Sequence, residues 1–137
     1  MLAVLNILFF VFHTALILFN VFGWIPVKTR KWNLATLTLT FFSWCVMGIW
    51  KGEGYCICTD WHWQVRRAMG IHDDPNSYLI LLVQKVSGWT PPSSLVNTVA
   101  LYVFVVSIAG SAFLNIRDWR RRRQGFQNRM TRPPRPE

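Results

Sequence analysis

The sequence predicts an all-α integral membrane protein with three transmembrane helices and two short interfacial or re-entrant helices in an outer cap. The chain has 137 residues, of which 52% are hydrophobic, yet its formal net charge is +9. Apolar and basic residues must therefore be segregated along it. Three segments are mostly uncharged and long enough to cross a hydrocarbon layer about 30 Å thick at about 1.5 Å per helical residue.

We expect the three spans at residues 2–24, 33–50 and 94–116. The first has no Lys or Arg before it and no small-residue cleavage site after it, so we expect it to stay in the mature chain. Asn33 is placed to cap the second span, and the third follows two prolines that cannot continue a helix from upstream. The spans and the cap together form one predicted domain, residues 1–116.

Positive charge is concentrated on one side of the predicted membrane. The loop between the first two spans and the tail after the third hold 11 of the 15 Lys and Arg residues, and the other four lie in residues 51–93. By the positive-inside rule, the N-terminus and residues 51–93 lie outside, and the tail is cytoplasmic. We therefore expect a multi-pass membrane protein whose first loop and tail face the cytoplasm.

Residues 117–137 form a basic tail that we expect to be partly disordered. Clustered arginines can bind nucleic acid. Here the cluster begins directly where a span ends, which favours anionic lipid headgroups instead. We expect membrane lipids as partners and no nucleic acid. The expected lipid contacts are Lys28, Arg30, Lys31, Arg120, Arg121, Arg122 and Arg123.

Residues 51–93 are expected to form a tryptophan-rich outer cap with two helices. The first starts at a Thr-Asp pair ending at Asp60, closes at Gly70 and carries Arg66 off its apolar face, so we expect it to lie flat in the interface. The second opens with Asp74 as its cap and stops at Gly88. At about 20 Å it is too short to span a membrane. We expect it to be half submerged or re-entrant.

Polar residues recur at helical spacing within the spans. In the first span, Asn6, His13 and Asn20 are each seven residues apart and so share one stripe. A polar stripe facing lipid is costly, so the stripes should meet inside the bundle. Hydrogen bonding between helices explains them, although His13 also suits a proton relay, a haem or metal ligand, or a quinone contact. The intramembrane polar positions are Asn6, His13, Asn20, Thr36, Thr40 and Tyr102.

The segment GYCICTDWHW, residues 54–63, holds the other candidate site. Cys56 and Cys58 have three possible roles: simple structural use, a labile disulfide or redox pair, or a metal set completed by His62. The paired knuckles of familiar zinc sites and the C-x-x-C-H motif of c-type haem attachment are absent from the sequence. A phosphate-binding glycine loop, a G-x-S-x-G elbow and an H-E-x-x-H motif are absent too.

Three motifs carry a resemblance to a known family. They are a first-span His, a Cys-x-x-Thr run followed by Arg and Gly within YCICTDWHWQVRRAMG, and the later SYLILLVQKVSGWTP. Together they resemble the small bacterial inner-membrane proteins known as domain of unknown function 2784, over residues 8–115. Cys58 and the Trp-His-Trp run depart from the commoner pattern. The family has no established activity, so the resemblance supports the fold. The matching positions are His13, Cys56, Thr59, Arg66 and Gly70.

The function expected from the sequence is that of a non-enzymatic accessory or interaction subunit of a larger membrane assembly. Its small size and the lack of a complete catalytic set motivate this, and the partner would be another membrane protein or a second copy of the chain. No cofactor is expected. The alternative is a periplasm-facing redox or metal/haem-binding protein that uses Cys56, Cys58 and His62 together with His13.

Overall fold

The computed structural model describes residues 1–51, 56–72, 75 and 77–130, and these residues form helices and turns without a strand. The predicted all-α class is confirmed. In chain order the elements are α1 (Leu2–Phe22), α2 (Arg30–Phe42), the π-helix η1 (Ser43–Met47), α3 (Gly48–Lys51), α4 (Ile57–Ala68), α5 (Tyr78–Ser87) and α6 (Ser93–Met130).

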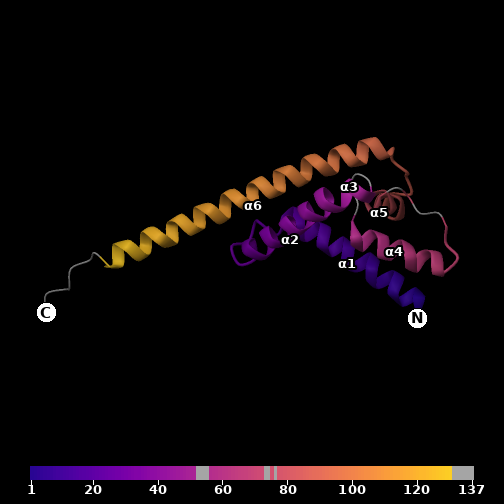
Figure 1. Ribbon diagram of the computed structural model, residues 1–137, viewed down its shortest axis with the longest axis horizontal. Coiled ribbons are helices and arrows are strands. Elements are labelled where there is room, and N and C mark those ends of the chain that lie inside the picture. The colour runs from indigo at the N-terminus through magenta and orange to yellow at the C-terminus, as the bar shows by residue number, and fades with distance from the viewer. Residues whose placement is uncertain (52–55, 73–74, 76, 131–137) are drawn as a thin grey trace.

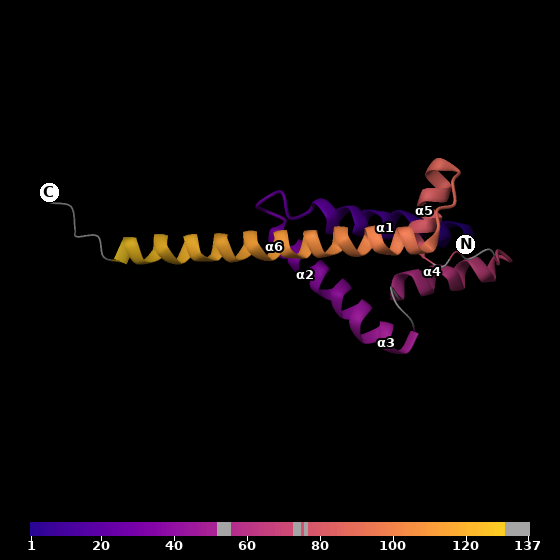
Figure 2. The same ribbon diagram turned by 90° about the horizontal axis from the view of Figure 1, so that it is seen from above.

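The three long helical segments form a bundle, and the short helices gather at one end of it. α1 and α6 run in the same direction, and α2 returns antiparallel to both (Figure 1). The arm formed by α2, η1 and α3 diverges from α1 and α6 toward its far end (Figure 2). α4 runs back along the N-terminal half of α1, while α5 crosses the long axis of the bundle (Figure 2).

Within the part of the chain that the structure describes, two helices are long and apolar enough to cross a membrane: α1, and α6 over Ser93–Gln127. The second predicted span corresponds to a continuous helical run from α2 to α3. The π-helix divides this run into three elements, none of which reaches spanning length alone, so the third crossing stays a prediction. One-turn π segments are frequent at functional sites. The π-helix here carries Trp44 and Cys45, which both line cavities between the helices.

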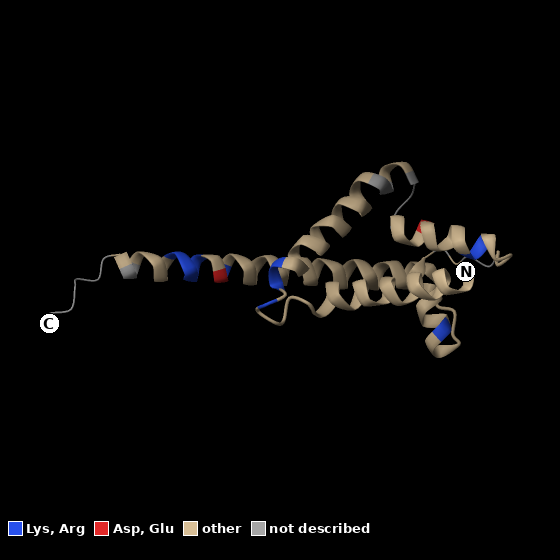
Figure 3. Ribbon diagram, turned by 90° about the horizontal axis from the view of Figure 1, so that it is seen from below, with Lys and Arg blue, Asp and Glu red and all other residues tan. Residues whose placement is uncertain are grey.

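The surface of the bundle is apolar in its middle and charged at its ends. Phe12, Leu39 and Val106 lie on three different helices, and each is more than half exposed. Figure 3 places the described charged residues on the long α6 extension, at the loop before α2, and around α4 and α5, with uncharged helix between them. Apolar patches of this extent are rare on soluble monomers and typical of interaction or membrane surfaces.

The helix α6 extends into the basic tail that the sequence predicts to be partly disordered. It continues to Met130. Arginine and glutamine have high helix propensity, and basic residues near a helix C-terminus interact favourably with the helix dipole. The Arg123 guanidinium also lies 4.0 Å from the centroid of the Trp119 ring, one turn earlier. Residues 131–137 lie outside the described part of the chain.

The two cap helices exist, but both begin at positions other than those predicted. α4 starts at Ile57, before the predicted Thr-Asp cap, and α5 starts at Tyr78, after Pro75. The predicted cap residue of α5, Asp74, lies outside the described residues. The predicted end at Gly88 is confirmed, where a φ of 72° closes α5 in the left-handed conformation that glycine adopts without a Cβ penalty.

Candidate functional site

A group of polar and aromatic side chains joins α1 to α4 and α5. We call this group the cap cluster. Most of its contacts cross between segments more than 40 residues apart in the sequence. It therefore fixes the position of the cap on the bundle. Its members are Asn6, His13, Thr14, Cys56, His62 and Tyr78.

Tyr78, the first residue of α5, is the centre of the cap cluster and is 3% exposed. Its hydroxyl donates to the carbonyl oxygen of Phe10 at 2.7 Å and lies 2.8 Å from Thr14 Oγ1. Its ring stacks on His13, with centroids 4.0 Å apart and planes 3° apart. Burial raises the pKa of the Tyr78 phenol, so the hydroxyl remains a donor at neutral pH. The start of α5 is therefore set by docking onto α1.

His62 attaches α4 to the N-terminal turns of α1. It is 1% exposed, and its Nε2 lies 2.7 Å from Asn6 Oδ1, so Nε2–H donates to this amide oxygen. Trp63 and Arg66 are buried on the same side of α4. The sequence placed Arg66 off the buried face. It is buried with His62 and Trp63, and its guanidinium lies 5.4 Å from the centroid of the Trp63 ring, while Trp61 is 51% exposed.

Cys56 and Cys58 are free thiols at the start of α4. Cys56 Sγ lies 4.0 Å from His13 Nε2. Burial and the neighbouring Cys56 raise the pKa of the Cys58 thiol, which lowers its thiolate fraction. The residues of the predicted metal site have different partners: Cys56 contacts His13, whereas His62 bonds to Asn6. The described residues contain no group of three His, Cys, Asp or Glu side chains suited to a metal ion. The redox and metal roles stay predictions.

The polar stripes of α1 and α2 meet near the other end of the bundle. Asn20 Nδ2 donates to Thr40 Oγ1 at 3.1 Å, and Asn33 Nδ2 donates to the carbonyl oxygen of Phe19 at 2.6 Å. Thr36 instead donates to a carbonyl oxygen within its own helix. Tyr102 is 69% exposed and lies outside this polar interior. Interhelical hydrogen bonding thus accounts for Asn20 and Thr40 among the predicted intramembrane positions, but not for Thr36 or Tyr102.

Arg30 connects the loop after α1 to α6 and does not behave as the predicted lipid contact. Its guanidinium donates to Asp118 Oδ2 at 2.7 Å and to the carbonyl oxygen of Trp24 at 3.0 Å, and its side chain is 11% exposed. Asn115 Nδ2 donates to the Arg30 carbonyl oxygen. The guanidinium lowers the pKa of the Asp118 carboxyl. Sequence reasoning missed this network, although a single acid among arginines directly after a span was a usable signal.

The other predicted lipid contacts are exposed, as such a role requires. Lys28 lies in the loop before α2, Lys31 lies in the first turn of α2, and the others lie on the extension of α6 past the apolar part of the helix. The full set is Lys28, Lys31, Arg120, Arg121, Arg122 and Arg123.

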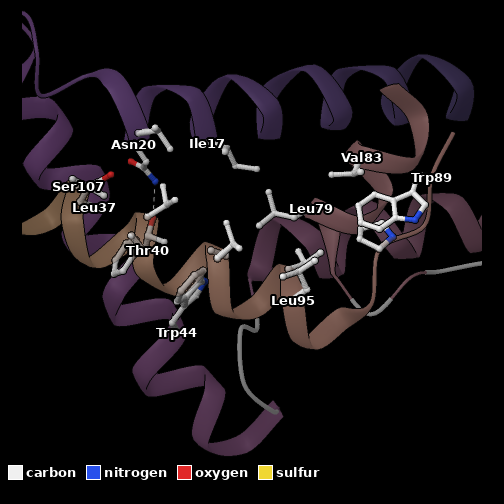
Figure 4. Close-up of a pocket in the computed structure, with 17 residues that line it drawn as sticks. Ile17, Asn20, Leu37, Thr40, Trp44, Leu79, Val83, Trp89, Leu95 and Ser107 are labelled. Atoms are coloured by element: carbon white, nitrogen blue, oxygen red, sulfur yellow. Dashed lines mark hydrogen bonds between the residues drawn. The ribbon is translucent and has the colours of Figure 1, made fainter. Parts of the chain in front are cut away.

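Two adjoining cavities lie between the helices, with volumes of 370 Å³ and 520 Å³. The first is bordered by α1, α2, η1, α5 and α6, and Figure 4 shows its mostly apolar lining with Asn20 and Thr40 on one side. The second reaches the cap cluster at His13, Cys56 and Tyr78. No Lys, Arg, Asp or Glu among the described residues lines either one. Both cavities border Ile17, Asn20, Thr40, Trp44, Leu79 and Ala100.

The comparisons with known proteins give one result. The family described as "Protein of Unknown function (DUF2784)" matches residues 3–116, which include the cap cluster and the apolar part of α6. No curated protein and no solved structure matches the chain. Because the match covers most of the chain, the protein belongs to the DUF2784 family.

Proposed function

We propose that this protein is a multi-pass protein of the bacterial inner membrane, with its N-terminus and cap outside and its C-terminus in the cytoplasm. The observation that supports membrane insertion is the apolar, exposed middle of the bundle between two charged ends (Figure 3). The long α6 extension and the loop before α2 supply the more basic end, which favours this orientation. The arm from α2 to α3 would be the third crossing, because its helical run matches the length of α1.

We further propose that it acts as a non-enzymatic accessory subunit, and that the fixed cap is its partner-binding surface. The cap cluster supports this, because His13, His62 and Tyr78 make buried contacts between α1 and the cap. A cap held this way is preorganised for binding, which lowers the entropic cost of association. Val86 and Trp89, at the outer end of α5, are 80% and 57% exposed and suit contact with another membrane protein or a second copy of this chain.

Photo-crosslinking in living cells tests the accessory role. A photoreactive residue at Val86, on the cap, should give one defined adduct of higher mass. The same residue at Val106, which is 64% exposed in the middle of α6, should give lipid adducts only. Monomer alone at both positions would contradict the proposal, and mass spectrometry of the Val86 adduct distinguishes a foreign subunit from a second copy.

The redox alternative has one observation in its favour, the approach of Cys56 to His13. Metal analysis, an absorption spectrum for haem and thiol titration of the same purified protein separate the two functions. The accessory role predicts three titratable thiols, no bound metal or haem and no reversible thiol couple. A reversible couple that disappears in both Cys56→Ser and Cys58→Ser would instead support the redox function.

A further inference from the structure

The basic extension of α6 carries an exposed apolar stripe. Residues 117–130 hold six Arg and one Asp, yet Trp119, Phe126 and Met130 recur there at spacings of seven and four residues. These spacings place the three side chains on one face of the helix. They are 53%, 65% and 73% exposed. The stripe is therefore left uncovered by the described part of the chain.

The length of α6 carries this stripe past the lipid. The uncharged run from Leu95 to Ile116 is about 33 Å long, which already matches a hydrocarbon layer of about 30 Å. The headgroup region adds about 5–8 Å on each side. Phe126 and Met130 lie about 15 Å and 21 Å beyond Ile116 along the helix. Because α6 continues as one straight helix (Figure 1, Figure 2), the stripe projects into water when the apolar run is in the membrane.

The stripe has the pattern of a coiled-coil seam. Trp119, Arg123, Phe126 and Met130 follow one another at spacings of four, three and four, which are those of the a and d positions of a heptad. Such a seam is narrow, whereas a helix that packs on a broad apolar surface has an apolar face at least about 100° wide. Arg123 lies within the seam, with its guanidinium 4.0 Å from the centroid of the Trp119 ring. This pattern fits a single partner helix.

Charge decides which kind of helix that partner is. Arg120 and Arg122 occupy the e and g positions beside the seam, and charges at these positions set partner choice in coiled coils. In a parallel pair of two copies of this chain, the two Arg123 side chains would face each other within the seam, and like charges repel. The extension therefore favours a partner helix with acidic side chains over a second copy.

We propose that residues 116–130 bind an acidic amphipathic helix of another protein as a short coiled coil. Apolar side chains of that helix pack against Trp119, Phe126 and Met130, and its carboxylates pair with the arginines in and beside the seam. The extension is already helical, which lowers the entropic cost of pairing. The inference rests on the proposed membrane insertion, which carbonate extraction tests separately, and it does not depend on the cap surface.

Fluorescence anisotropy with the full-length protein in phosphatidylcholine nanodiscs tests the proposal. The probe is a labelled synthetic helix of three heptads with Leu at a and d, Glu at e and g, and one Glu in place of a seam Leu. We expect saturable binding that weakens as salt is raised. The matched peptide with Lys in place of every Glu should bind at least about tenfold more weakly, because like charges then meet. Equal binding of both peptides, or no saturable binding, would overturn the proposal.

Two variants with the same change of charge locate the binding face. Phe126→Glu places a carboxylate in the seam and should weaken binding of the acidic peptide at least about tenfold. Gln124→Glu places it on the far side of the helix and should change binding by less than about twofold. Both positions are exposed, so neither change removes a packed side chain. Equal weakening by the two variants would mean a general attraction between charges and would contradict a seam.

An anionic membrane surface is the competing occupant, and a fluorophore at the seam distinguishes the two. Bimane is attached to Met130→Cys in a chain whose native cysteines are replaced by serine. We expect its emission to stay the same when phosphatidylglycerol is included in the nanodiscs, and to shift to the blue when the acidic peptide binds. A blue shift with phosphatidylglycerol alone would show that the extension lies on the membrane, which would refute the proposal.

Discussion

Replacing Tyr78 with alanine is expected to lower the free energy of unfolding by about 3–5 kcal/mol, the range measured when a buried aromatic side chain is truncated. The change removes the ring stacked on His13 and the hydroxyl bonded at Phe10 and Thr14. Because these contacts hold α5 on α1, the cap should also become accessible to protease. Unfolding in a denaturing detergent, followed by circular dichroism, measures the first effect, and limited proteolysis measures the second.

Tyr102 provides a matched control because it is the same residue type and is 69% exposed. Tyr102→Ala should change stability by less than about 0.5 kcal/mol, as is usual for surface substitutions. Tyr78→Phe keeps the ring and loses only the hydroxyl, so it should cost about 0.5–1.5 kcal/mol. If Tyr78→Ala and Tyr102→Ala lowered stability equally, the cap cluster would not be what fixes the cap to the bundle.

The second large effect is expected at Arg30. Arg30→Met keeps an unbranched side chain but removes the charged donor to Asp118 and to the carbonyl oxygens of Trp24 and Ile25. Hydrogen bonds to charged groups contribute more than those between neutral groups, so we expect a measurable loss of stability that exceeds the effect of the control. Lys31→Met, at the adjacent exposed position, is the control and should have little effect. Denaturant unfolding of both variants checks this.

The pH dependence of the Arg30 variant provides an independent readout. Arg30 lowers the pKa of Asp118, so the stabilisation from this pair is present above the ordinary aspartate pKa of about 3.9 and is lost as the pH falls through the lowered value. The stability difference between wild type and Arg30→Met should therefore shrink as the pH falls through this range. A difference that stays constant to low pH would show that Arg30 acts through its backbone contacts alone.

The parts of the fold that could be predicted are those set by local patterns. The α1 and α6 spans follow from uncharged apolar runs, and Gly88 ends α5 because only glycine adopts its conformation without penalty. The extension of α6 beyond residue 116 was not predicted, because the appearance of charged residues marks the end of an apolar span and not the end of a helix. The π-helix η1 was not predicted, because a change of helix type over five residues leaves the apolar pattern of the span intact.

The sequence identified several residues of the candidate site but not the residues that they contact. His13, Asn6 and Asn20 were identified by their seven-residue spacing, but their partners depend on which face of each cap helix docks on α1. Tyr78 was not recognised because a tyrosine at a helix start gives no local signal of a contact 64 residues away. The cavities depend on helix divergence, which a single sequence does not encode.

Cysteine labelling from outside intact cells tests the central claim, a protein inserted in the inner membrane with its cap outside. Single cysteines are introduced at Lys28, Trp89 and Phe126, all exposed positions, in a chain whose native cysteines are replaced by serine. We predict that a membrane-impermeant maleimide labels Trp89→Cys in intact spheroplasts, and labels Lys28→Cys and Phe126→Cys only after permeabilisation. Labelling of Lys28→Cys in intact spheroplasts, or protection of Trp89→Cys, would contradict the orientation, and release of the protein by alkaline carbonate would contradict membrane insertion.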